Sequence, residues 1–285
     1  TQPNAKYDAQ GNAGIINIKL KRNKVKGVNG NIGASYTQGQ YGRFNSNAFL
    51  GYRSGKWNLT GSYSGVQHAG FNEIKVTRYF RKKSDHQLQS IFDQSTFLKY
   101  NGNNYQVKAG VDFIASEKTT LGINLQKGAN HLNFDVPTVM KMYDPNKTYT
   151  GQAITKGVNN LDNENLTLNF NFRVKFDSLG RELSGDADYA QYSDNGRQQL
   201  DNYFYDADGV ENAAPYLLKG HNPSLFNIYS AKVDYTHPVS KTLKFETGIK
   251  GSYVYSDHES SFLNKNSGEW EIDDRTNHFL YTENI

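Results

Sequence analysis

The sequence predicts an all-β protein that forms part of an antiparallel transmembrane β-barrel. Three observations predict this fold: long stretches alternate between apolar and polar residues, the connections between them alternate between short and long, and 20 Tyr and 16 Phe accompany 26 Gly. Strict alternation gives a strand one apolar and one polar face. Aromatic residues pack well on pleated sheets, and glycine relieves crowding there.

The composition excludes several other classes of protein. A mean hydropathy of -0.76 and the lack of an 18-residue apolar stretch exclude a helical membrane protein. Lys and Arg total 32 against 28 Asp and Glu, and these charges are spread along the chain, so we expect no nucleic-acid partner. The absence of Cys excludes disulfide scaffolds, thiol nucleophiles and Cys-based metal sites.

The clearest strand lies at residues 166–176. Leu166, Leu168 and Phe170 begin an apolar series that Thr167 and Asn169 interrupt at every second position. Similar patterns recur in both halves of the chain, and we expect roughly ten strands, each with one wet and one apolar face. The predicted strands are 27–38, 43–53, 56–67, 97–115, 119–130, 165–177, 181–197, 226–237, 241–256 and 277–285.

The predicted connections differ in length in a regular order. Tight turns at 54–56, 116–118, 177–180 and 237–240 alternate with long polar stretches at 68–96, 131–164, 198–225 and 257–276. Outer-membrane barrels have short periplasmic turns and long extracellular loops in this way. All six Pro lie outside the predicted strand interiors.

A soluble β-sandwich also has alternating strands, so strand length and aromatic placement decide between the two folds. The predicted strands of about 10 to 12 residues match the ~9–11 that cross a bilayer at a tilt, whereas soluble strands average about 5–6. Aromatic residues also gather near strand ends, as membrane interfaces require. They are Tyr36, Tyr52, Trp57, Tyr100, Phe176, Tyr235 and Tyr255.

Residues 3–20 resemble the closing segment of the plug domain in TonB-dependent outer-membrane receptors. Tyr7-Asp8 before Gly11, followed by Gly14-Ile15-Ile16-Asn17-Ile18, is similar to the outer-membrane β-barrel family of Bacteroidetes-type receptors. The resemblance implies that residues 1–24 end a plug domain and residues 25–285 begin a 22-stranded barrel, so that the chain is incomplete at both ends. It further implies the bacterial outer membrane, the rest of the barrel and plug, periplasmic TonB and a surface lipoprotein lid as partners.

Charges of both signs occupy the polar faces of the predicted strands. We expect them to line the lumen and to hydrogen-bond a plug and water; a general hydrated wall is the alternative. These residues are Lys108, Asp112, Arg173, Lys175, Asp186, Asp188, Lys232 and Asp234, with Lys244 and Glu246 in the same pattern.

The long connections carry aromatic residues among polar ones, which is a common arrangement for binding sugars or peptides. Packing of these rings under their own loops is the alternative. The candidate ligand-binding residues are Tyr79, Phe80, Tyr143, Tyr149, Tyr203, Tyr205 and Tyr216, with Phe92 and Phe204 nearby.

No residue is singled out as catalytic, and we expect neither an enzyme nor a cofactor. The seven His show no metal-ligand spacing. Asp206-Ala207-Asp208-Gly209 starts like a calcium loop but lacks its 12-residue ligand pattern. The first hypothesis is therefore uptake of a large solute (a siderophore, glycan or peptide) through a TonB-dependent receptor. The alternatives are a structural or adhesion barrel and a soluble carbohydrate-binding β-sandwich.

Overall fold

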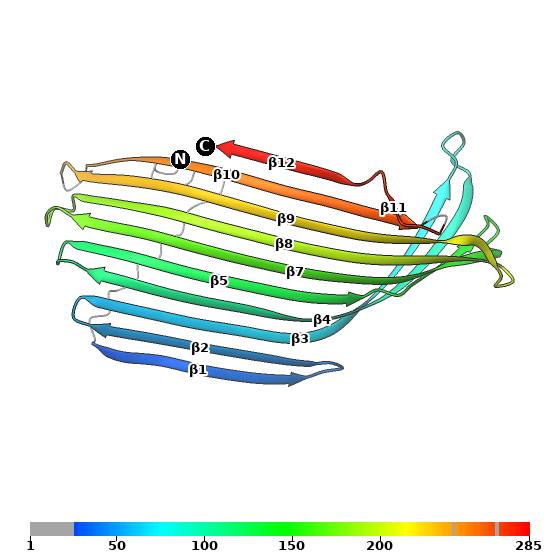
Figure 1. Ribbon diagram of the computed structural model, residues 1–285, viewed down its shortest axis with the longest axis horizontal. Helices are drawn as coiled ribbons and strands as arrows, with labels where there is room; N and C mark the ends of the chain where they lie inside the picture. The colour runs from blue at the N-terminus through cyan, green and yellow to red at the C-terminus, as the bar shows by residue number, and fades with distance from the viewer. Residues whose placement is uncertain (1–25, 241–242, 266–267) are drawn as a thin grey trace.

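The computed structural model describes residues 26–240, 243–265 and 268–285. Their strands form one antiparallel sheet in the order β1-β2-β3-β4-β5-β7-β8-β9-β10-β11, with β12 on β10 and β6 between β4 and β7 (Figure 1). The predicted end of a plug domain, residues 1–24, lies outside the described residues. Within the described ranges, no helix is long and apolar enough to span a bilayer.

Most strands pair with the next strand in sequence, so the sheet is built largely from hairpins; β5 instead pairs with β7, and β12 with β10. The strands are β1 (Gly27–Gln38), β2 (Gly42–Ser54), β3 (Trp57–Arg81), β4 (Leu88–Ile114), β5 (Thr119–Asp135), β6 (Thr138–Tyr143), β7 (Tyr149–Lys175), β8 (Glu182–Asp206), β9 (Glu211–Pro238), β10 (Lys244–Lys265), β11 (Glu271–Ile272) and β12 (Asn277–Asn284).

Three of the predicted long loops are extensions of the strands, which is the main correction to the sequence-based prediction. Most of 68–96, 131–164 and 198–225 continues the ladder, so that β3, β4, β7, β8 and β9 have 25 to 28 residues each. The fourth stretch, 257–276, is partly strand, since β10 continues to Lys265. Both faces of these extensions carry polar residues, so strand pairing continues there without the apolar alternation that marks a strand in a sequence.

Three prolines lie on the path of these long strands, which also corrects the prediction. Pro137 separates β5 from β6, yet its carbonyl accepts a hydrogen bond from the amide of Phe97 at 3.1 Å and the register with β4 is the same on both sides. Pro215 lies where the pairing of β8 with β9 shifts, and Pro223 faces Asn195 inside β9. A proline removes one ladder donor, which water can replace on a wet extension.

The sheet is a single layer without a conventional core. Among the described residues the buried hydrophobic side chains are Ile91, Ala153 and Leu218, all in or beside the extensions. In contrast, Ile123 is 52% exposed and Ile249 is 76% exposed. The described residues contain no second sheet to cover these side chains, so the soluble sandwich alternative is wrong.

Candidate functional site

One face of the sheet, here called the outer face, carries a continuous apolar band. A row of paired residues across four strands shows it: Leu59 faces Val111, Val111 faces Ile123, and Ile123 faces Phe170. These side chains lie next to the short turns and are all more than one third exposed. An exposed apolar band of this extent is unfavourable in water but stable against lipid tails.

Aromatic residues mark both borders of this band. Near the short turns, the rings of Trp57 and Phe113 lie 4.6 Å apart and those of Phe176 and Tyr235 lie 6.4 Å apart. At the other border, Tyr189, Tyr229 and Tyr253 form a row with ring separations of 5.0 and 6.3 Å. Rings with a polar edge are favoured at membrane interfaces.

Tyr100 does not belong to the predicted set of interfacial aromatic residues. It lies on the opposite face of the sheet, here called the inner face, where its ring contacts His68 at 5.8 Å. Tyr100 pairs with Gly70, and a Cβ at Gly70 would lie 2.4 Å from the tyrosine hydroxyl. The sequence held the signal for this placement, because Tyr100 has the opposite parity to the apolar series of Tyr105 and Val107 in the same predicted strand.

All eight predicted lumen residues lie on the inner face, as do Lys244 and Glu246. Asp112 accepts a hydrogen bond from Asn58 Nδ2 at 3.0 Å, and Asp188 accepts one from Asn169 Nδ2 at 2.7 Å. Arg173 Nε lies 3.3 Å from Glu182 Oε1. The inner wall therefore holds several of its charges in cross-strand polar pairs.

Asp234 is the most buried of these charged side chains. The residue is 5% exposed, and its Oδ2 lies 3.4 Å from Lys232 Nζ. Its Oδ1 is buried and has no hydrogen-bond partner. This oxygen lies against Gly248 of β10, where the missing side chain leaves room for it, and it is closed off from the lumen.

The sequence analysis missed a set of asparagines that spans the same wall. Asn124 donates to Asn169 at 3.2 Å, and Asn171 donates to the same oxygen at 2.7 Å. On the inner face, Asn58 links β3 to β4, while Asn124 and Asn169 link β5, β7 and β8. Their regular position on the polar side of each strand was the available signal, but uncharged amides were not selected as candidates.

The seven predicted aromatic ligand residues lie in or at the ends of strands, and the structure does not bring them together. Tyr79, which is 60% exposed, and Phe80 belong to β3. Tyr143 and Tyr149 contact each other at 5.9 Å across the turn between β6 and β7. Lys156 Nζ lies over the ring of Tyr203, 5.3 Å from its centre. Tyr205 lies one residue before the end of β8, while Tyr216 in β9 accepts a hydrogen bond from Arg275 Nη2 at 2.6 Å.

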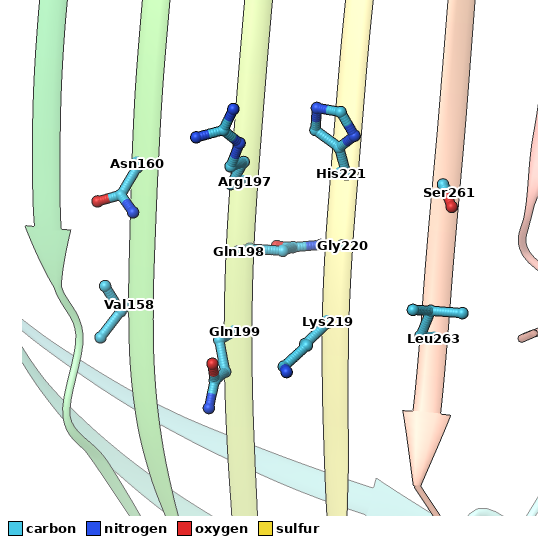
Figure 2. A pocket seen from close by; sticks show the side chains of 10 residues that line it. All are labelled: Val158, Asn160, Arg197, Gln198, Gln199, Lys219, Gly220, His221, Ser261 and Leu263. Carbon is cyan, nitrogen blue, oxygen red and sulfur yellow. The ribbon is translucent and has the colours of Figure 1, made fainter. Parts of the chain in front are cut away.

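A cationic groove of about 510 Å³ lies on the outer face, where β7 to β10 extend beyond the apolar band. Figure 2 shows Arg197, His221 and Lys219 on the neighbouring strands β8 and β9. Lys219 Nζ also lies 4.3 Å from the ring centre of Trp270. Arg197 lies about 26 Å beyond Tyr189 along β8. This distance is greater than the thickness of a lipid headgroup layer, so the groove lies in water.

Within the described ranges, no group of three His, Asp or Glu side chains is close enough to hold a metal ion. The charge pair of Asp273 and Arg275 instead fixes the connection between β10 and β12. The Arg275 guanidinium donates to both carboxylate oxygens of Asp273, at 2.6 and 2.7 Å, and Asn264 Nδ2 donates at 2.9 Å. These hydrogen bonds hold the pKa of Asp273 well below its usual range.

Comparisons with known proteins agree with this geometry. Residues 174–285 match the family described as "Outer membrane protein beta-barrel family". No curated protein and no solved structure gives a significant match. The matched residues include the end of β7 and all of β8, β9 and β10, which carry both the apolar band and the inner wall. Together with the exposed apolar band, this match over residues 174–285 identifies the chain as an outer-membrane β-barrel protein of the bacterial outer membrane.

Proposed function

We propose that this sheet is part of the wall of a TonB-dependent receptor that takes up a large solute past a plug domain. The observation that carries the proposal is the width of the open sheet. Nine strands, β1 to β5 and β7 to β10, carry the apolar band, yet β1 does not pair with β10 or β12. About eight strands already close around an interior filled by side chains. A barrel that is still open after nine strands encloses a wider, water-filled lumen.

The polar groups of the inner face favour the presence of a plug domain in that lumen. A hydrated pore needs only polar side chains, whereas this wall arranges charges and amides in cross-strand pairs. Such groups suit docking of a polar domain surface. The similarity of residues 3–20 to the end of a plug domain supports the same proposal, and it is the basis for TonB and a lipoprotein lid as partners.

Uptake by cells tests the transport function. The complete gene is deleted, and growth is compared on siderophores, glycans and peptides supplied as single nutrient sources. We expect the deletion to abolish growth on one of these sources, and a protonophore or the loss of TonB to abolish uptake of the same solute. Uptake that persists without energy, or a deletion that changes only envelope integrity, would instead support the structural barrel.

The plug contact has its own test in the intact receptor. Asp188→Ala and Asp234→Ala remove inner-face carboxylates, and we expect each to weaken retention of the plug, measured as faster cleavage of the plug by added protease. Asp201→Ala is the matched control, because Asp201 lies on an extension and accepts hydrogen bonds from Gln199 at 3.2 Å. Equal cleavage in all three variants and the wild type would argue for a hydrated wall.

A further inference from the structure

Two hollows of opposite polarity lie one above the other on the outer face of β1 to β4. The lower hollow has a volume of about 690 Å³ and lies inside the apolar band. Gly30, Ala48 and Gly61 form its floor, while Ile32, Leu50 and Tyr63 surround it. This floor is open because a residue without a side chain lies on each side of Leu50: Gly30 pairs with Leu50, and Leu50 with Gly61.

The upper hollow has a volume of about 310 Å³ and lies at the border of the band on the side of the strand extensions. The rings of Tyr36 and Phe44 and the amides of Gln67, Asn101 and Asn103 line it. The side-chain amides of Gln67 and Asn103 make no hydrogen bond with any described residue. Lys99 lies beside it, with its Nζ 5.5 Å from the ring centre of Tyr41.

The passage between the hollows is lined by small residues and by the Tyr63 ring, whose hydroxyl end leans over Gly65. Ala34 pairs with Ser46, and Ser46 pairs with Gly65, one row above the lower hollow and one row below Tyr36 and Phe44. Tyr36 follows Ile32 by four positions, which corresponds to about 13 Å along the strand. Half the hydrocarbon thickness of a bilayer is about 15 Å, so the pair of hollows matches one leaflet.

We propose that these two hollows bind one glycolipid of the outer leaflet. The acyl chain occupies the lower hollow, in continuity with the lipid-facing band. The sugar headgroup occupies the upper hollow, where aromatic faces and free amides supply the contacts that hydroxyl-rich rings accept. A headgroup phosphate lies within the field of Lys99. The site depends on the lipid-facing band and not on the proposed transport, so either proposal can fail alone.

Native mass spectrometry of the intact receptor, with lipid A or phosphatidylglycerol added, tests the lipid site. Gly61→Leu fills the lower hollow, since a Cβ at Gly61 would meet no atom within 4 Å. Gly251→Leu is the matched control, because a Cβ at this outer-face glycine of β10 would meet only the carbonyl of Ile285 at 4.0 Å. The double variant Gln67→Leu/Asn103→Leu removes the free amides of the upper hollow.

We expect the wild type and Gly251→Leu to retain one lipid A, and Gly61→Leu to bind it about tenfold more weakly, since displacing about two methylenes costs that factor. The double variant should lose the preference for lipid A over phosphatidylglycerol. Unchanged lipid A binding in Gly61→Leu would overturn the site. Equal affinity of the wild type for both lipids would overturn the assignment of the ligand as a glycolipid. A change of oligomeric state in Gly61→Leu, without a change in bound lipid, would assign the hollows to contact between copies.

Discussion

At the scale of single residues, the inner wall is built from glycines covered by amides. Gly122 pairs with Asn171, and Gly33 pairs with Asn47. A Cβ at Gly122 would lie 2.6 Å from Asn171 Oδ1, and one at Gly33 would lie 2.5 Å from Asn47 Oδ1. The missing side chain lets the amide lie flat on the neighbouring strand, where it reaches the next amide of the wall. In this position glycine is required for close approach and not for an unusual backbone angle.

Gly122→Ala tests this arrangement. We expect a loss of about 1 kcal/mol in the free energy of unfolding, because the new methyl group displaces the Asn171 amide, whose hydrogen bond to Asn169 is then lost. Gly61→Ala is the control, since its Cβ would have free space, and it should be neutral within about 0.5 kcal/mol. Urea unfolding of the refolded barrel in detergent micelles measures both. Equal stability of the two variants would show that the amide accommodates the methyl group.

The Asp273–Arg275 pair predicts a dependence on pH. The lowered pKa of Asp273 means that its carboxylate stabilises the folded connection above the unfolded pKa of ~3.9. This contribution is lost as the pH falls through the lower, folded pKa. Arg275→Gln removes the largest cause of the shift. We therefore expect the connection to open at a higher pH in Arg275→Gln than in the wild type, with Asn264→Ala between them.

Fluorescence of Trp270 reports this opening, because Trp270 belongs to the same connection as Asp273 and its ring packs on Lys219 of β9. The sequence contains 2 Trp, so a Trp57→Phe background leaves Trp270 as the reporter within these residues. Acid titration of the three proteins then gives three transition midpoints. Coincident midpoints would show that Asp273 does not control the connection.

At the scale of elements, each long strand has two parts with different physics. The part beside the short turns alternates between apolar and polar residues, because its two faces meet different solvents, and this part was predicted correctly from the sequence, as in residues 166–176 of β7. The extension meets water on both faces. Its pairing follows from the backbone ladder and the register inherited from the first part, so no periodicity marked residues 149–164 as strand. The cationic groove was missed for this reason, since Arg197, Lys219 and His221 become neighbours only through the extensions.

Two adjacent residues of β7 test the assignment of the faces. Leu168 lies in the apolar band and is 43% exposed, while Thr167 lines a polar hollow of about 290 Å³ on the inner face. Leu168→Arg should cost about 1 kcal/mol of stability, because it places a charge at the border of the hydrocarbon, opposite Tyr189. Thr167→Arg places the same side chain in the lumen and should cost much less. The shift of mobility on heating in detergent gels gives the folded fraction of each, and a larger loss for Thr167→Arg would reverse the faces.

At the scale of the whole molecule, the apolar band crosses the rows of paired residues obliquely. One row runs from Ile32 through Ala48, Tyr63 and Val107 and continues on β5 as Lys127. It then passes Leu166, Gln191 and Asn227 and reaches Tyr255 on β10. The same row is thus apolar on β1 to β4 and mostly polar on β5 to β10. A row can leave the hydrocarbon in this way only if the strands are tilted in the bilayer.

The registers give the size of this tilt. The row that starts with Trp57, the first residue of β3, reaches Ile249 on β10, five residues beyond the first residue of that strand, Lys244. Five residues of ~3.3 Å across six strand spacings of ~4.8 Å correspond to a tilt of roughly 30°. Membrane barrels have tilts of about 35–45°, so the stagger of the turns is near the one that closure into a barrel requires.

This tilt predicts different membrane depths for residues of one row. The sequence has no Cys, so single cysteines at positions 32 and 255 can carry a spin label in the barrel reconstituted into lipid. We expect the label at Ile32→Cys to be accessible to oxygen and shielded from a water-soluble nickel complex, because it lies within the hydrocarbon. The label at Tyr255→Cys should show the opposite, since its row leaves the band before β10. Equal depth at the two positions would mean that the strands stand upright, and the oblique band would then have no structural cause.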